Sequence, residues 1–76
     1  MSEIVMSEIP LAVVSRIMKV AGAERVNIEA IKIVAEKTET YGVAVAKEAI
    51  NLAKVADRKT VQAVDIKLAT ERINKR

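Results

Sequence analysis

The chain has no cysteine and no histidine among its 76 residues. Disulfides, thiolate or imidazole metal ligands, and catalysis that depends on either side chain are therefore excluded. The carboxylates are scattered along the chain, without a glycine-rich phosphate loop or a nucleophile constellation beside them. We therefore expect no enzyme activity, no cofactor, no metal site and no small-molecule substrate.

Aromatic side chains and long apolar runs are also scarce. Tyr41 is the only aromatic residue, which disfavours the stacking platforms used by proteins that bind single-stranded nucleic acids. There is no charge-free apolar run of about 18 residues, and no basic segment precedes an apolar one at the N-terminus. We therefore expect neither a membrane span nor a signal peptide, and a protein that stays in the compartment where it is made.

Size and charge placement indicate one small domain with its basic character on the folded body. A monomer of this length buries only about 60% of its extended-chain surface, so its own core is marginal. Residues 1–10 contain two glutamates and no base, whereas residues 57–76 contain six Lys or Arg residues. We expect residues 1–7 to be a loosely ordered extension and residues 8–76 to be the folded domain.

Apolar residues recur every three or four positions in three segments, which predicts helices at about 9–20, 28–55 and 62–74. Pro10 suits a first helical turn, and Gly22 closes the first segment. Asn27 is a good N-cap for the central segment. The predicted order is a short helix, a loop, a long helix, a loop and a short helix.

The central helix is too long for its own domain to cover. Twenty-eight residues span about 42 Å, whereas a compact chain of this size has a diameter of about 30 Å. Apolar residues lie on both faces of the helix, so we expect a second chain to cover the rest in an obligate dimer. Close approach of the crossing helix explains Gly42 near its middle. A different bundle without contact to nucleic acid stays open on these grounds.

Three stretches resemble archaeal histones: "SRIMKVAGAERV" (15–26), "EAINLAK" (48–54) and "RKTVQAVDIKLA" (58–69). The resemblance covers residues 8–76. It implies an all-α histone fold, in which two chains pair head to tail. It also implies that the protein binds double-stranded DNA without sequence preference, and wraps and compacts it in the nucleoid of the cytoplasm.

The resemblance also implies roles for individual residues. Arg58 is expected to pair with Asp65 and to hold the second loop against the body, since its planar guanidinium suits a bidentate pair. Arg16 and Arg25 are the candidates for entering narrowed minor grooves. The full set of expected DNA contacts is Arg16, Lys19, Arg25, Lys59 and Thr60.

Other matched positions concern assembly. Gly22 matches a glycine that permits stacking of successive superhelical turns. Val55 stands where these histones usually have a histidine that bonds across a dimer–dimer interface, and Asp57 stands where they usually have glycine. The expected interface residues are Leu52, Val55, Asp65 and Leu68.

Two further functions stay open. The altered interface also suits a variant that pairs with itself or with other histones and limits or caps wrapped arrays. A histone-fold subunit of a transcription factor is the other alternative, although such subunits normally need extra segments or a heterodimeric partner.

Overall fold

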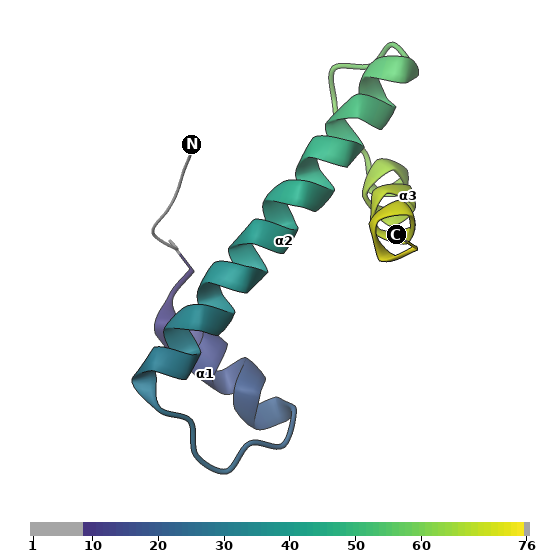
Figure 1. Ribbon diagram of the computed structural model, residues 1–76. Helices are drawn as coiled ribbons and strands as arrows, with labels where there is room; N and C mark the ends of the chain where they lie inside the picture. Colours follow the sequence, from purple (N-terminus) through teal and green to yellow (C-terminus); the bar gives the residue numbers. More distant parts are fainter. Residues whose placement is uncertain (1–8, 76) are drawn as a thin grey trace. The chain divides into compact units, whose positions relative to one another are not determined.

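A computed structural model describes residues 9–75 of the chain (Figure 1). Three helices follow one another, α1 (Leu11–Val20), α2 (Ile28–Val55) and α3 (Ala63–Asn74), and no strand occurs among residues 9–75. The expectation of an all-α fold is therefore confirmed. The expected extension at residues 1–7 lies outside the described residues.

Helix α1 begins after Pro10, which serves as its N-cap with φ −59° and ψ 133°. The Pro10 carbonyl oxygen accepts hydrogen bonds from the backbone N–H groups of Val13 and Val14. Proline suits this place because its missing N–H leaves no donor unsatisfied. The helix thus starts two residues later than predicted, within the usual uncertainty of helix ends.

Helix α1 ends in a left-handed glycine. Gly22 has φ +113°, and its N–H donates to the Lys19 carbonyl oxygen at 2.9 Å. The next N–H, that of Ala23, donates to the Met18 carbonyl oxygen at 3.1 Å. These two bonds make a Schellman motif, which satisfies carbonyl groups that the helix leaves without partners.

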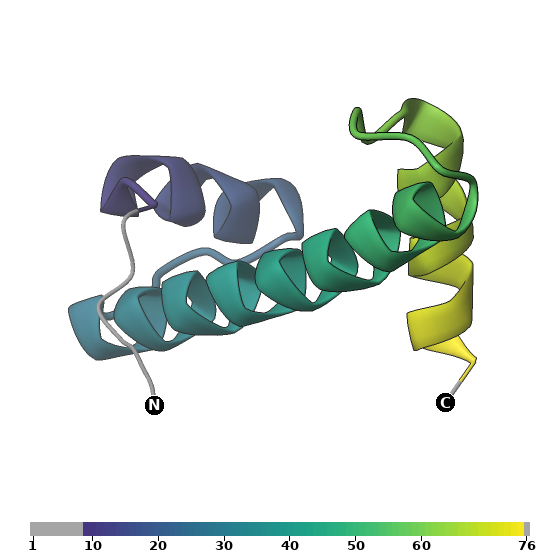
Figure 2. The same cartoon turned by 90° about the horizontal axis from the view of Figure 1, so that it is seen from above.

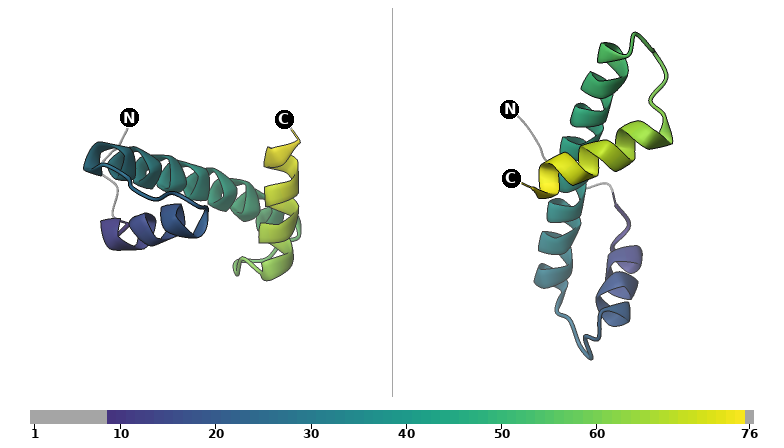
Figure 3. Two further views of the ribbon diagram at one scale, coloured as in Figure 1. Left: turned by 90° about the horizontal axis from the view of Figure 1, so that it is seen from below. Right: turned by 90° about the vertical axis from the view of Figure 1, so that its right-hand side faces the viewer.

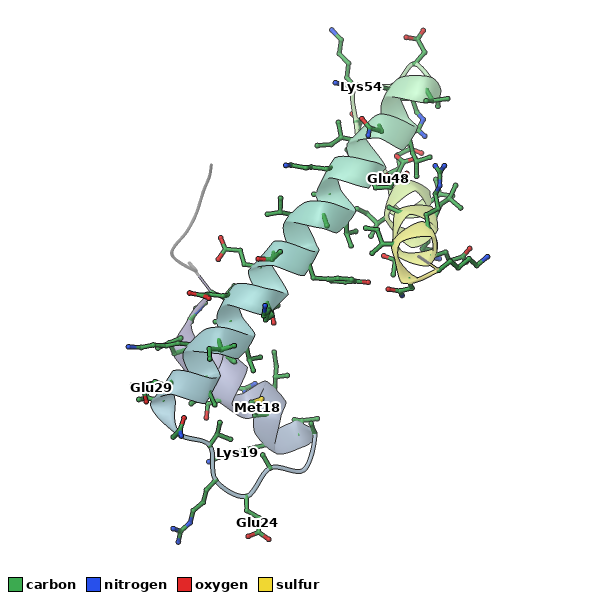
Figure 4. The ribbon with its side chains drawn as sticks, in the orientation of Figure 1. Met18, Lys19, Glu24, Glu29, Glu48 and Lys54 are labelled. Atoms are coloured by element: carbon green, nitrogen blue, oxygen red, sulfur yellow. The ribbon has the colours of Figure 1, made fainter. Side chains whose placement is uncertain are left out.

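Helix α2 has the bounds that the sequence predicts. The Asn27 side-chain oxygen accepts a hydrogen bond from the Ala30 N–H at 2.9 Å, which is the geometry of an N-cap. Glu29 lies in the first turn, where its negative charge meets the positive end of the helix dipole (Figure 4).

Helix α2 ends in the same motif as α1, with an aspartate in place of the glycine. Asp57 has φ +61° and is the only non-glycine residue with positive φ among residues 9–75. Its N–H donates to the Lys54 carbonyl oxygen and the Arg58 N–H donates to the Ala53 carbonyl oxygen, both at 2.9 Å. The chain leaves α2 into the second loop through this turn.

The chain divides into two compact units, Met1–Thr40 and Tyr41–Arg76, with the boundary inside α2. In the first unit α1 lies along the beginning of α2 (Figure 2). Its core contains Val14, Ile31 and Ala35. Partly buried side chains surround these three: Ile9, Leu11, Met18, Val26 and Val34.

In the second unit α3 packs against the part of α2 that follows Thr40 (Figure 3). Its core contains Val45, Ala49 and Ala69, with Leu52 and Ile73 packed against them. Most buried apolar side chains of both units are small. Val14 is the only large side chain that is fully buried among the described residues. None of the three helices is long and apolar enough to span a bilayer.

Two side-chain contacts hold α3 to α2 within the second unit. The Tyr41 hydroxyl donates a hydrogen bond to the Asn74 side-chain oxygen at 3.0 Å. Arg72 and Glu48 form an ion pair with 3.0 Å between Nη1 and Oε2, and Figure 4 shows Glu48 on the side of α2 next to α3. The two contacts fix the last turns of α3.

Candidate nucleic-acid interface

The second loop, residues 56–62, is organised by the Arg58 guanidinium. Its Nη2 donates to Asp65 Oδ1 at 2.8 Å and its Nη1 donates to Asp65 Oδ2 at 2.9 Å. Nη1 also donates to the Thr60 carbonyl oxygen at 3.2 Å. Arg58 therefore ties the loop both to the start of α3 and to its own backbone. The bidentate pair needs the planar fork of arginine, which lysine lacks.

Asp65 is buried, with 3% of its surface exposed, and its carboxylate is fully occupied. Besides Arg58 it accepts a hydrogen bond from the Gln62 backbone N–H at 2.8 Å, which also satisfies the first residue before α3. The hydrogen bonds from Arg58, and then that from Gln62, lower the pKa of Asp65 to about 2. The same contact with Asp65 raises the pKa of Arg58.

This arrangement separates the neighbouring bases Arg58 and Lys59. Arg58 is half-buried and spends its donors inside the chain, whereas Lys59 and Thr60 are exposed. Lys59 forms no ion pair or side-chain hydrogen bond within the described residues. The loop therefore presents one free ammonium group and one hydroxyl to solvent.

The other candidate contacts lie on α1 and the first loop. Arg16 and Lys19 are exposed and three positions apart on α1, so they share one side of that helix. Arg25 is exposed in the first loop beside Glu24, and Figure 4 shows Glu24 projecting from the loop away from the helices.

The candidate cations fall into two groups within one chain. Arg16, Lys19 and Arg25 belong to the first unit, and Lys59 belongs with Thr60 to the second. Each group is exposed on its own unit. Cationic and hydroxyl side chains of this kind bind phosphate oxygens without reading bases.

The candidate assembly residues differ in exposure. Val55 is 86% exposed and Leu68 is 45% exposed, whereas Leu52 is half-buried against the core of the second unit. Asp65 is buried by its contacts within the chain, which satisfy its charge without a histidine partner. Gly42 and Gly22 have no atom within 4 Å of the position that a Cβ would occupy.

Three features of the site region were not predicted from the sequence. The Tyr41–Asn74 hydrogen bond and the Glu48–Arg72 ion pair join residues far apart in the chain, and no local pattern signals them. The positive φ of Asp57 is the third. Its signal was present, because three residues in a row after Val55 break the helical apolar period.

Three helices in the order short, long, short, with exposed bases on α1 and on both loops, define a histone-fold protein. The family model of histone-like transcription factors (CBF/NF-Y) and archaeal histones matches residues 7–70, and the chain belongs to this family. The match crosses the boundary between the two units. The resemblance to archaeal histones that the sequence suggested is thereby confirmed.

Two relatives match most of the chain. The archaeal histone HAN1 of Thermococcus zilligii is 46% identical over 66 residues, which are 87% of this chain and 98% of the relative. Probable archaeal histone 3 of Methanocaldococcus jannaschii is 45% identical over 64 residues, which are 84% of this chain and 96% of the relative. The chain is therefore a DNA-binding architectural protein of a family that packages DNA without enzymatic activity.

Proposed function

We propose that two copies of the chain pair head to tail and wrap double-stranded DNA without sequence preference, compacting it in the nucleoid of the cytoplasm. In this dimer the first loop of one copy lies beside the second loop of the other. Arg25 of one chain then joins Lys59 and Thr60 of its partner in a single phosphate-binding ridge at each end, while Arg16 and Lys19 bind between the ends.

The small core of the single chain supports dimerisation. Val13 and Ile17 lie one turn apart on α1, and both are about half exposed. Further large apolar side chains are exposed along the rest of the chain: Val20, Ile28, Ile33, Val43, Ile50, Val61, Val64 and Ile66. Such surface is more than a stable monomer of this size ordinarily leaves uncovered, because burial of apolar area is what stabilises the folded state.

Gly42 supports the same arrangement. Each glycine in a helix interior costs about 1 kcal/mol relative to alanine. The open space beside Gly42 leaves room for a second helix to approach the backbone of α2 closely. Gly22, which is exposed and likewise has open space beside it, leaves room for successive turns of a superhelix to stack.

The observation that carries the DNA-binding proposal is the division of labour in the second loop. Arg58 is consumed by Asp65 and Thr60, and this fixes the loop so that Lys59 stays free. A buried bidentate pair that immobilises a loop, next to an unpaired exposed cation, suits a surface that must meet phosphates in a set geometry. None of the candidate contacts reads base edges, so DNA bendability governs site preference.

The proposal is tested by a mobility-shift series on a mixed-sequence duplex. With six to ten phosphate contacts per dimer, affinity is expected to fall by about 10³- to 10⁵-fold between 50 and 200 mM salt, and the modest net charge favours the lower figure. Lys59→Ala should weaken binding and flatten the slope, whereas Lys37→Ala, on an exposed position of α2, serves as the control. Binding without a salt dependence would contradict the proposal.

Val55 favours a second function, that of a histone that limits or caps wrapped arrays. It is 86% exposed at the end of α2, in a unit whose Leu68 is also exposed. Where archaeal histones usually have a histidine that makes a polar bridge between dimers, this chain presents an apolar side chain without a donor. Such a contact has less directional specificity than a hydrogen-bonded one.

Crosslinking on DNA separates the two functions. Products that extend beyond the dimer support wrapping in extended arrays, whereas products that stop at the dimer support capping. In the capping case Val55→His should restore the longer products. Val20→His, at a position 83% exposed on the other unit, is the matched control and should not restore them.

A further inference from the structure

We propose that Asp57 limits DNA affinity by cancelling the charge of Lys59, so that the second loop orients DNA without adding net attraction. This inference rests on the proposed function, because it assumes that the second loop faces phosphate. It assigns a role to a residue whose backbone conformation and charge are both unfavourable for the helix end that it occupies.

The backbone of Asp57 is in a conformation that glycine adopts at no steric cost. Asp57 has φ +61° and occupies the same place in its Schellman motif as Gly22 does in the motif that ends α1. A side chain in the left-handed region costs roughly 1–2 kcal/mol, less for aspartate and asparagine than for other residues. The fold therefore does not require a carboxylate here.

The charge of Asp57 is also misplaced with respect to the helix. The carboxylate follows the C-terminal end of α2, where the helix dipole favours cations and disfavours anions. Its side chain is exposed and makes no ion pair or hydrogen bond within the described residues. Neither stability nor a partner in the chain accounts for the negative charge.

The contacts of the loop show what this charge does. Arg58 is neutralised by Asp65, which leaves Asp57 and Lys59 as the unpaired charges of the second loop. Their sum is zero, because one is negative and one is positive. Helix α1, in contrast, carries Arg16 and Lys19 and no acidic residue. Net attraction to phosphate thus comes from α1, and the second loop contributes position.

Two substitutions separate charge from conformation. Asp57→Asn removes the charge and keeps a residue that tolerates the left-handed region, whereas Asp57→Gly removes both the charge and the strain. Glu36→Gln, at an exposed position of α2 in the other unit, removes the same charge elsewhere and is the matched control. Lys59→Ala is included to test whether the second loop faces DNA.

We measure the dissociation constant for a mixed-sequence duplex at about 50 and 200 mM salt, with unfolding curves to verify folding. Both Asp57 variants should bind roughly fivefold more tightly at the lower salt, with a steeper salt slope, and Glu36→Gln should stay close to the wild type. If Asp57→Asn binds like the wild type, if only Asp57→Gly gains, or if Glu36→Gln gains as much, the role of Asp57 is wrong.

The same data distinguish this failure from failure of the proposed function. If the wild type binds with a salt slope and Lys59→Ala weakens it while Asp57→Asn changes nothing, the DNA-binding surface stands and Asp57 has no role in it. If the wild type shows no salt-dependent binding, both proposals fall.

Discussion

The Arg58 guanidinium has two partners, the Asp65 carboxylate and the Thr60 carbonyl oxygen, and together they decide the shape of the second loop. The pairing of Arg58 with Asp65 could be expected from the sequence through the resemblance to archaeal histones. The contact with Thr60 could not, since it depends on how the loop backbone turns after Asp57. A half-buried charge with its donors satisfied leaves its neighbour Lys59 as the residue that meets solvent.

At the residue scale, the low pKa of Asp65 predicts a loss of stability in acid. The pKa is about 2 in the folded chain, below the usual 3.8, because Arg58 and the Gln62 N–H stabilise the ionised form. A group whose pKa is lowered by folding contributes stability that is complete above its unfolded pKa. That contribution is lost as the pH falls from about 4 to about 2.

The measurement is urea unfolding at several pH values across this window, at one fixed protein concentration. Asp65→Asn removes the titrating group and should show a weaker dependence on pH between about 4 and 2, with lower stability at neutral pH. Glu71→Gln, an exposed position on α3, should keep the wild-type pH dependence. An Asp65→Asn curve parallel to that of the wild type would show that this pair does not carry the acid sensitivity.

The helices show how far local sequence determines structure. The bounds of α2 were predicted correctly, because Asn27 caps its start and helix formers continue without interruption. The start of α1 was placed two residues early, because Pro10 fits both a cap and a first turn. Asp57 was missed as a left-handed residue, because glycine, and not aspartate, is the usual signal for that conformation.

At the scale of elements, the two Schellman motifs predict substitutions of opposite sign. Gly22→Ala places a Cβ on a residue with φ +113° and should lower the free energy of unfolding by about 1–2 kcal/mol. Asp57→Gly relieves the corresponding strain at the end of α2 and should raise it by roughly 0.5–1 kcal/mol. Chemical unfolding of both variants at equal protein concentration checks the two signs, and a neutral Gly22→Ala would contradict the assignment of strain.

The whole molecule depends on an arrangement that one chain does not contain. The candidate cations could be selected from the sequence residue by residue, but they divide between two units of the chain. Their union in one ridge requires a second copy, and neither periodicity nor charge pattern specifies the geometry between copies. The small buried core and the exposed apolar side chains indicate why such a copy is needed.

The head-to-tail dimer is tested most directly by disulfide trapping, since the chain has no cysteine of its own. We mix one variant carrying Arg25→Cys with another carrying Lys59→Cys, let the dimers exchange, oxidise the sample and measure intact mass without reductant. The proposed pairing predicts a linked dimer in the mixture and far less in either variant alone, because only the mixture juxtaposes the two loops. Equal yields in all three samples, or a folded monomer with no linked product, would contradict it.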